Sequence, residues 1–358
     1  MNSNNFFYNY FVFCSDLEDY RGEGLLASKY IKTLTKFYPN IIFKCYSPSF
    51  SFYIKGNSIY NLQRSFRYKK KINFKYFSQY IIPFFGISLL WLNFFKKKKL
   101  LYINFLPLWN FFIFFLCPPR TIFGPITGSI YKGEVKNLTT FIRKIILPFL
   151  CKLSIRLQSL RSLNFCYSTD LLQNFLTENK SNHNIFNFQI RGIKPSLFKE
   201  KKKYDFLIYH RKYFGKNNEF ILKIAEFLIK KKYKVIIVGD QTCFPKSISF
   251  GTVTRNRMLN LLKATKYVFN PPDNFYSMFF IDSYNSGVKI FYDINQKPKI
   301  LFVQKNLIPI NFHDEENSKK KIIHELSKKF YFYNEINFFK KKFFNTEAKQ
   351  NLYFKSLL

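Results

Sequence analysis

The feature that most constrains this chain is the alternation, from one end to the other, of short strand-like runs with helical segments. The strand-like runs are rich in Phe, Ile, Val and Tyr, and turns separate them from segments with helical periodicity. Strands that alternate with helices build parallel sheets with helices on both faces. The pattern therefore predicts an α/β protein, and 358 residues are enough for two domains of ordinary size.

The alternation predicts two series of elements, separated by a linker candidate at 183–203 that contains Gly192, Pro195 and a lysine run. The first series is expected to have strands at 7–14, 41–46, 101–105, 120–124 and 165–168, and helices ending near 37 and over about 79–95, 107–116, 136–158 and 169–176. The second is expected to have strands at 206–209, 234–238, 267–270 and 289–292, and helices over 219–231, 255–264 and 277–285. Such short βα units are typical of Rossmann-like domains.

Two apolar stretches, Tyr76–Phe95 and Leu100–Pro119, each approach the roughly 20 residues that a membrane span requires. Polar residues and prolines interrupt both stretches, among them Pro83, Asn104 and Pro107. We therefore favour a soluble run of helix, strand, helix and strand. A membrane-inserted hairpin is the alternative.

The charge balance points to an anionic partner. The chain has 58 Lys and Arg against 21 Asp and Glu, a net charge of +37, which favours nucleic acid, anionic lipid or phosphate-bearing substrates. Part of this basicity is also explained by base composition, because Lys, Asn, Ile, Tyr and Phe share A/T-rich codons. The lysines nevertheless cluster, which suits a membrane or polyanion surface better than an even scatter would. The clusters are Lys96–Lys99, Lys201–Lys203, Lys230–Lys232 and Lys340–Lys342.

Cysteine and histidine spacing gives no sign of a metal or disulfide framework. The six cysteines include no C-x-x-C pair, and the four histidines have no metal-ligand spacing. The N-terminus has neither a basic start nor a long apolar segment, so no secretory signal is expected. A reducing cytosol fits best, and we expect no metal and no cofactor.

The loops after the second-half strands are the candidate sites, because ligands of open α/β sheets collect outside the carboxyl ends of the strands. The first of these loops carries Arg211 and Lys216, which are five residues apart around Gly215. Two cations so placed can converge on one diphosphate, although two solvated surface cations are the alternative. Further on, Asn274 and Asp282 lie eight residues apart, and a carboxylate there could hold ribose hydroxyls.

Four motifs follow one another between residues 200 and 295. They are Arg-x4-Lys at Arg211 and Lys216, a strand that ends in Gly and Asp at Val235–Asp240, Gly-x-Val at Gly251 and Val253, and an eight-residue spacing from Asn274 to Asp282. In order and spacing these motifs resemble those of the nucleotide-sugar-binding domain of GT-B glycosyltransferases, in particular the group 1 (family 4) type. In the first half, Arg21–Lys32 and Phe123–Ser129 resemble two Gly-containing loops of that family more loosely.

The resemblance implies a GT-B fold, in which two Rossmann-like domains with parallel sheets face each other across a cleft. The implied domains are an acceptor-binding domain over 1–195, a nucleotide-sugar-binding domain over 196–334, and a helical segment over 335–358 that crosses back to the first domain. The implied activity is hexosyl transfer from a nucleotide-sugar to a saccharide or lipid-linked acceptor, in cell-surface polysaccharide synthesis. Separately from the resemblance, the lysine clusters and the aromatic-rich segment 76–119 predict peripheral attachment to an anionic membrane, at its inner, cytoplasmic face. No nucleic-acid partner is expected.

The resemblance also implies roles for individual residues. Arg211 and Lys216 would stabilise the departing diphosphate, Asp282 would hold the ribose, and Asp273 with Asn274 would contact the donor sugar. The remaining donor-side candidates are Gly22, Glu23, Gly24, Gly239, Gly251, Val253 and Ser277. The acceptor-side loop would comprise Gly124, Pro125, Thr127 and Gly128.

The chain departs from the family pattern at three points. Asn274 and Asp282 stand where the family has two Glu residues, and no His precedes His183, whereas many members have a His in the first domain. A degenerate GT-B protein without catalysis is therefore one alternative. A basic protein that binds nucleic acid or a membrane is the other, and a salt titration of nucleic-acid binding would separate it.

Overall fold

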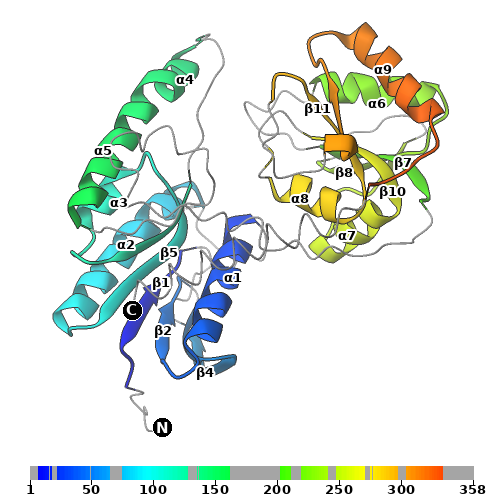
Figure 1. Cartoon of the computed structure of the whole chain (residues 1–358). Helices are drawn as coiled ribbons and strands as arrows, with labels where there is room; N and C mark the ends of the chain where they lie inside the picture. Colours follow the sequence, from blue (N-terminus) through cyan, green and yellow to red (C-terminus); the bar gives the residue numbers. More distant parts are fainter. Residues whose placement is uncertain are drawn as a thin grey trace. The chain divides into compact units, whose positions relative to one another are not determined.

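The protein consists of two compact units, which are described separately. The computed structural model describes residues 7–15, 17, 22–48, 50–64, 75–127, 135, 137–161, 202–210, 219–240, 247–270, 275, 277–296 and 304–333. Of these, residues 7–161 form the first unit and residues 202–333 form the second (Figure 1). The predicted strand at 165–168, the helix at 169–176, both domain boundaries and the returning segment 335–358 lie outside the described residues.

Six strands form the sheet of the first unit, in the order β4-β3-β2-β1-β5-β6. They are β1 (Tyr10–Phe13), β2 (Phe43–Tyr46), β3 (Phe50–Lys55), β4 (Ser58–Arg64), β5 (Lys99–Pro107) and β6 (Ile122–Thr127). Strands β2, β1, β5 and β6 are parallel, but β3 and β4 are antiparallel. The predicted parallel sheet is confirmed over four strands, but the antiparallel hairpin at this edge was not predicted from the sequence. The hairpin has a local cause: Gly56, with φ +55°, and Asn57 form a two-residue hairpin turn.

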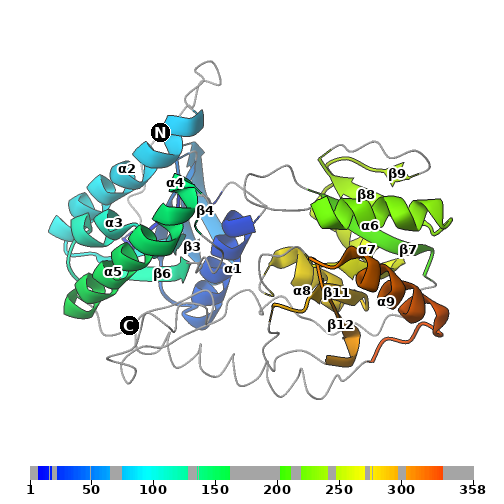
Figure 2. The ribbon, with the colours of Figure 1, turned by 90° about the horizontal axis from the view of Figure 1, so that it is seen from above.

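Helices cover both faces of the first sheet. They are α1 (Gly22–Phe37), α2 (Lys75–Phe95), α3 (Phe111–Leu116), α4 (Leu138–Phe141), a π-helical turn (Ile142–Ile146) and α5 (Leu147–Arg161). Figure 2 shows α1 on one side of the sheet and α2, α3 and α5 on the other. The predicted helix over 136–158 is interrupted by the π-helical turn. The predicted order of helix, strand, helix and strand over 75–127 is confirmed.

One core cluster of the first unit lies between the sheet and α2, α3 and α5. It contains Phe13 of β1, Leu90 of α2, Phe114 of α3 and Ile155 of α5. Gly86 lets α2 approach the sheet, because a Cβ there would overlap the ring of Phe13. Among the described helices, none combines the length and the apolar character that crossing a bilayer demands.

The sheet of the second unit is parallel throughout and has the order β12-β11-β10-β7-β8-β9. Its strands are β7 (Tyr204–His210), β8 (Val235–Gly239), β9 (Ile248–Ser249), β10 (Thr265–Phe269), β11 (Lys289–Asp293) and β12 (Leu307–Ile310). Counted along the chain, the strand order is 3-2-1-4-5-6, the doubly wound Rossmann order. The predicted α/β class with Rossmann-like units is confirmed.

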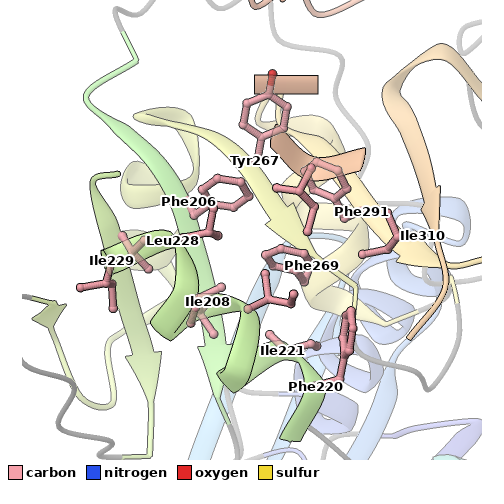
Figure 3. Close-up of a cluster of buried hydrophobic side chains, with 14 of the residues drawn as sticks. Phe206, Ile208, Phe220, Ile221, Leu228, Ile229, Tyr267, Phe269, Phe291 and Ile310 are labelled. Atoms are coloured by element: carbon pink, nitrogen blue, oxygen red, sulfur yellow. The ribbon is translucent and has the colours of Figure 1, made fainter. Parts of the chain in front are cut away.

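Two helical layers cover the second sheet. The helices are α6 (Glu219–Lys230), α7 (Arg255–Lys263), α8 (Met278–Asn285) and α9 (Glu315–Ser327), and a 3-10 turn spans Gln304–Asn306. One core cluster packs against α6 and centres on Phe206, which stacks on Phe269 at 5.5 Å between ring centroids (Figure 3). The other packs against α7 and α8 and contains Leu207 and Phe280. Because successive side chains of a strand point to opposite faces, α6 and α8 cover opposite sides of β7.

Candidate functional site

The strand order of the second unit singles out one place for a ligand. Strand β7 is central, with β8 on one side and β10 on the other. The chain leaves β7 toward α6 and β10 toward α8, which pack on opposite faces of the sheet. This is the topological switch point of a doubly wound sheet, where ligands bind outside the carboxyl ends of the strands.

A row of polar residues and one glycine lies at this carboxyl edge. The register pairs His210, at the end of β7, with Gly239, at the end of β8. Asn270 follows β10 directly, and Asp293 ends β11. His210 and Asp293 are only 6% and 7% exposed, and Asn270 is fully buried. Polar groups are rarely so deeply buried without a structural or binding role, so the edge between β7 and β10 is the candidate site.

Asn270 and Gln296 form an incompletely satisfied amide pair at this edge. The Asn270 Nδ2 donates to Gln296 Oε1 at 3.1 Å, and the Asn270 backbone N–H donates to the carbonyl of Phe291 at 2.7 Å. The buried Asn270 Oδ1 and Gln296 Nε2 have no hydrogen-bond partner among the described residues. Leaving a buried polar group unpaired costs about 1–3 kcal/mol. The pair thus leaves one acceptor and one donor unsatisfied at this edge.

Gly239 holds the ends of β7 and β8 together. Its φ is +118°, and a Cβ would overlap the carbonyl oxygen of His210. The Gly239 N–H donates to the carbonyl of Gly251 at 2.9 Å, and the Asp240 N–H donates to the carbonyl of His210 at 3.0 Å. Gly251 also has a positive φ, +58°, but a Cβ added there would have no neighbour within 4 Å. Val253 packs against the α7–α8 core cluster.

Two predicted donor-side residues belong to α8. The Ser277 Oγ caps the helix by accepting from the Phe280 N–H at 3.1 Å. Asp282 forms an ion pair with Arg255, the first residue of α7, with 2.8 Å between Oδ1 and the guanidinium. The side chains of Arg255 and Asp282 are 30% and 13% exposed, so the pair is well shielded from solvent. Sequence reasoning missed Arg255, whose only signal was a position just after the Gly-x-Val turn.

Several predicted residues of the second unit lie outside the described residues. They are Arg211, Lys216, Asp273 and Asn274. Arg211 follows His210 in the chain and Asn274 comes four residues after Asn270, so both belong to segments that join the candidate edge. Their roles stay predictions.

The described residues among the first unit's predicted site residues belong to α1 and β6. Gly22 and Glu23 begin α1, the helix that follows β1, and Gly24 is buried in its first turn. Gly124 and Pro125 lie within β6 and are joined by a cis peptide bond. Thr127 ends β6, and Gly128 is outside the described residues. Whether these residues contact donor or acceptor stays a prediction.

Within the described residues, no three His, Cys, Asp or Glu side chains gather in a group that could hold a metal ion. The buried ion pair that stands out lies elsewhere, between Lys289 of β11 and Glu325 of α9, at 2.7 Å. Burial acts to raise the pKa of Glu325, but hydrogen bonds from Lys289 and Lys328 outweigh it and leave this pKa below its ordinary value. The pair joins the sheet to α9 and takes no part in the candidate site.

The sequence matches no known family model and no curated protein. Among solved structures, a variant of TarM from S. aureus, in complex with fondaparinux, alpha-GlcNAc-glycerol and UDP, is similar at 14% identity and a TM-score of 0.50 over 73% of this chain and 55% of that one. The pneumococcal O-GlcNAc transferase GtfA, in complex with UDP and GlcNAc, is similar at 12% identity and a TM-score of 0.39 over 56% and 46%. This chain thus spans about half the length of each.

A UDP-GlcNAc 2-epimerase from Methanocaldococcus jannaschii, in complex with UDP-GlcNAc and UDP, is similar at 11% identity and a TM-score of 0.45 over 91% of this chain and 94% of that one. The likeness to TarM and the two Rossmann-like units define the class of fold. It is the fold of the GT-B glycosyltransferases.

Proposed function

We propose that this protein is a glycosyltransferase that moves a hexose from a nucleotide-sugar to a saccharide or lipid-linked acceptor, as a step in cell-surface polysaccharide synthesis. The observation that carries the proposal is the row of buried polar groups at the switch point of the second sheet. The similar TarM variant is in complex with UDP, which supports a nucleotide as the ligand of this edge.

In this proposal the second unit holds the donor. Asn270 and Gln296 offer one acceptor and one donor to the nucleoside, and Asp282, oriented by Arg255, receives ribose hydroxyls. Arg211 and Lys216 neutralise the diphosphate. Their attraction strengthens as the departing diphosphate gains charge, so they act more strongly on the transition state than on the bound donor.

The proposal is tested by screening nucleotide-sugars for thermal stabilisation of the full chain and then assaying the stabilising donor for sugar transfer. A ligand at 100 times its dissociation constant stabilises by about 2.7 kcal/mol. We expect one donor class to stabilise the chain and to release its nucleotide when an acceptor is added. Stabilisation without transfer of the sugar to an acceptor would instead indicate a degenerate GT-B protein. If no nucleotide-sugar stabilised the chain, the proposal would be contradicted.

A further inference from the structure

The first unit carries a helix whose N-terminal part buries nothing. The continuous helix formed by α4, the π-helical turn and α5 begins with the residues LTTFIRKII, and none of these nine side chains is buried. Leu138 is 74% exposed, and Phe149, further along, is 65% exposed. A helix within a protein gains most of its stability by packing an apolar face, so the exposure of this one indicates a partner.

The exposed apolar residues of this helix share one side. Leu138, Phe141, Ile145 and Phe149 are spaced three or four residues apart, the spacing that aligns side chains along a helix. Farther along α5 the same side carries two exposed cations, Lys152 and Arg156.

The neighbouring helices extend this surface. α3 packs against both α2 and α5, and Figure 2 shows the three helices in one layer on the same face of the sheet. Their sides that face away from the sheet therefore form one surface, which we name the outer helical face. Its large exposed apolar residues are Phe84, Leu92, Phe95, Phe112, Phe115, Phe141, Ile145 and Phe149. Exposed apolar residues on neighbouring helices of one layer are unusual on a folded domain that has no partner, and they usually mark an interaction site.

Charge indicates which partner fits. From Lys75 to Arg161 the sequence has thirteen Lys or Arg residues and a single acidic residue, Glu134. Arg143 and Lys144 are exposed in the same turn as Ile145. Lys152 and Arg156 are exposed at helical spacing from Phe149. A second copy of this chain would bring the same positive charge to the contact, and like charges repel. An anionic bilayer offers acyl chains to the apolar residues and phosphates to the cations.

We propose that the outer helical face docks on an anionic membrane, with the helix that begins at Leu138 lying in the plane of the headgroups. The apolar residues enter the boundary between headgroups and acyl chains, and the cations contact lipid phosphates. This inference rests on the first unit and holds whether or not the second unit binds a nucleotide-sugar.

The test is co-flotation of the full chain with vesicles of phosphatidylcholine alone or with about one third phosphatidylglycerol. We expect binding to the anionic vesicles only, declining as salt rises. The double variant Ile145→Glu/Phe149→Glu changes two exposed side chains and should weaken binding at least about tenfold. The matched control, Ile248→Glu/Ile294→Glu, changes two exposed isoleucines of the second unit and should bind like the unaltered chain.

Three results would overturn the proposal. One is equal binding of the two double variants to anionic vesicles, and another is no binding to them at low salt. The third is lipid-free self-association of the full chain, measured by light scattering, that Ile145→Glu/Phe149→Glu abolishes. That last result would assign the outer helical face to a second copy of the chain.

Discussion

The two units differ in how far their helices are buried and in how their charged residues are paired. In the second unit, α6 buries six of its twelve residues, whereas the nine residues that begin the α4–α5 helix of the first unit bury none. The second unit pairs acids with bases inside its fold, as in Arg255 with Asp282 and Lys289 with Glu325. Between Lys75 and Arg161 of the first unit, the sequence has one acidic residue against thirteen basic ones.

The difference indicates that the two units bind different kinds of partner. The described part of the second unit pairs several of its charged groups internally, and the unpartnered amide atoms of Asn270 and Gln296 lie at a sheet edge that suits a small polar ligand. The first unit leaves both apolar and cationic groups at its surface, which suits an extended partner. Four further experiments test this contrast.

The largest effect is expected at Gly239. Gly239→Ala forces a Cβ into the carbonyl of His210 in a backbone conformation with φ +118°, so it should destabilise the second unit by about 2–4 kcal/mol. Gly251→Ala is the matched control, because it shares a positive φ but has nothing within 4 Å of the new Cβ, and should cost about 1 kcal/mol. Denaturant titration of the full chain measures both. If both variants lost the same free energy of unfolding, Gly239 would not hold the ends of β7 and β8 together as described.

The next effect concerns the proposed diphosphate contacts. Arg211→Ala should weaken donor binding or turnover at least about tenfold, since a hydrogen bond to a charged group contributes about 1.5–3 kcal/mol. Lys216→Ala should have a similar effect, while neither change alters the unfolding midpoint. Donor titrations at fixed salt provide the measurement. Unchanged donor affinity in both variants would remove these residues from the site.

A smaller effect is expected at the ion pair between α7 and α8. Asp282→Asn removes the charge that Arg255 orients and should lower donor affinity several-fold, by about 1 kcal/mol for a weakened ribose contact. Arg255→Lys keeps the positive charge and should lower donor affinity less than Asp282→Asn does. If Asp282→Asn reduced stability but left donor affinity unchanged, the pair would be purely structural.

The smallest effect is a pH dependence carried by Glu325. Because its folded-state pKa lies below the ordinary value, its contribution to stability is present above the unfolded pKa of about 4.3 and is lost as pH falls through the folded value. Glu325→Gln should therefore flatten the acid side of the stability profile. Lys328→Gln removes an exposed partner of the same carboxylate and should flatten it less. The assignment to Glu325 would be contradicted if stability fell with the same slope at low pH in the unaltered chain and in both variants.

The sequence predicted the fold wherever periodicity was strong and local. The helices that became α6, α7 and α8 were predicted within about two residues because their apolar spacing is regular and turns flank them. The β3–β4 hairpin was missed, although Gly56 and Asn57 form a recognisable two-residue turn. β9 was missed because two residues carry no periodicity.

The site was predicted only in part. Strand ends could be located from the sequence, and they drew attention to the segments that follow β7 and β10, 211–218 and 271–274, which lie outside the described residues. The Asn270–Gln296 and Arg255–Asp282 pairs join residues 26 and 27 positions apart. No local pattern links such partners, because the fold alone brings them together.

The central claim is that a nucleotide binds at the switch point between β7 and β10. Calorimetric titration of the full chain with UDP, GDP, ADP and dTDP, repeated on Asn270→Ala, tests it most directly. We predict that one nucleotide binds and that Asn270→Ala weakens it about tenfold, the value of one buried hydrogen bond, whereas Asn256→Ala, at an exposed position on α7, leaves it unchanged. Equal affinity in all three proteins, or binding of none of the nucleotides, would contradict the claim.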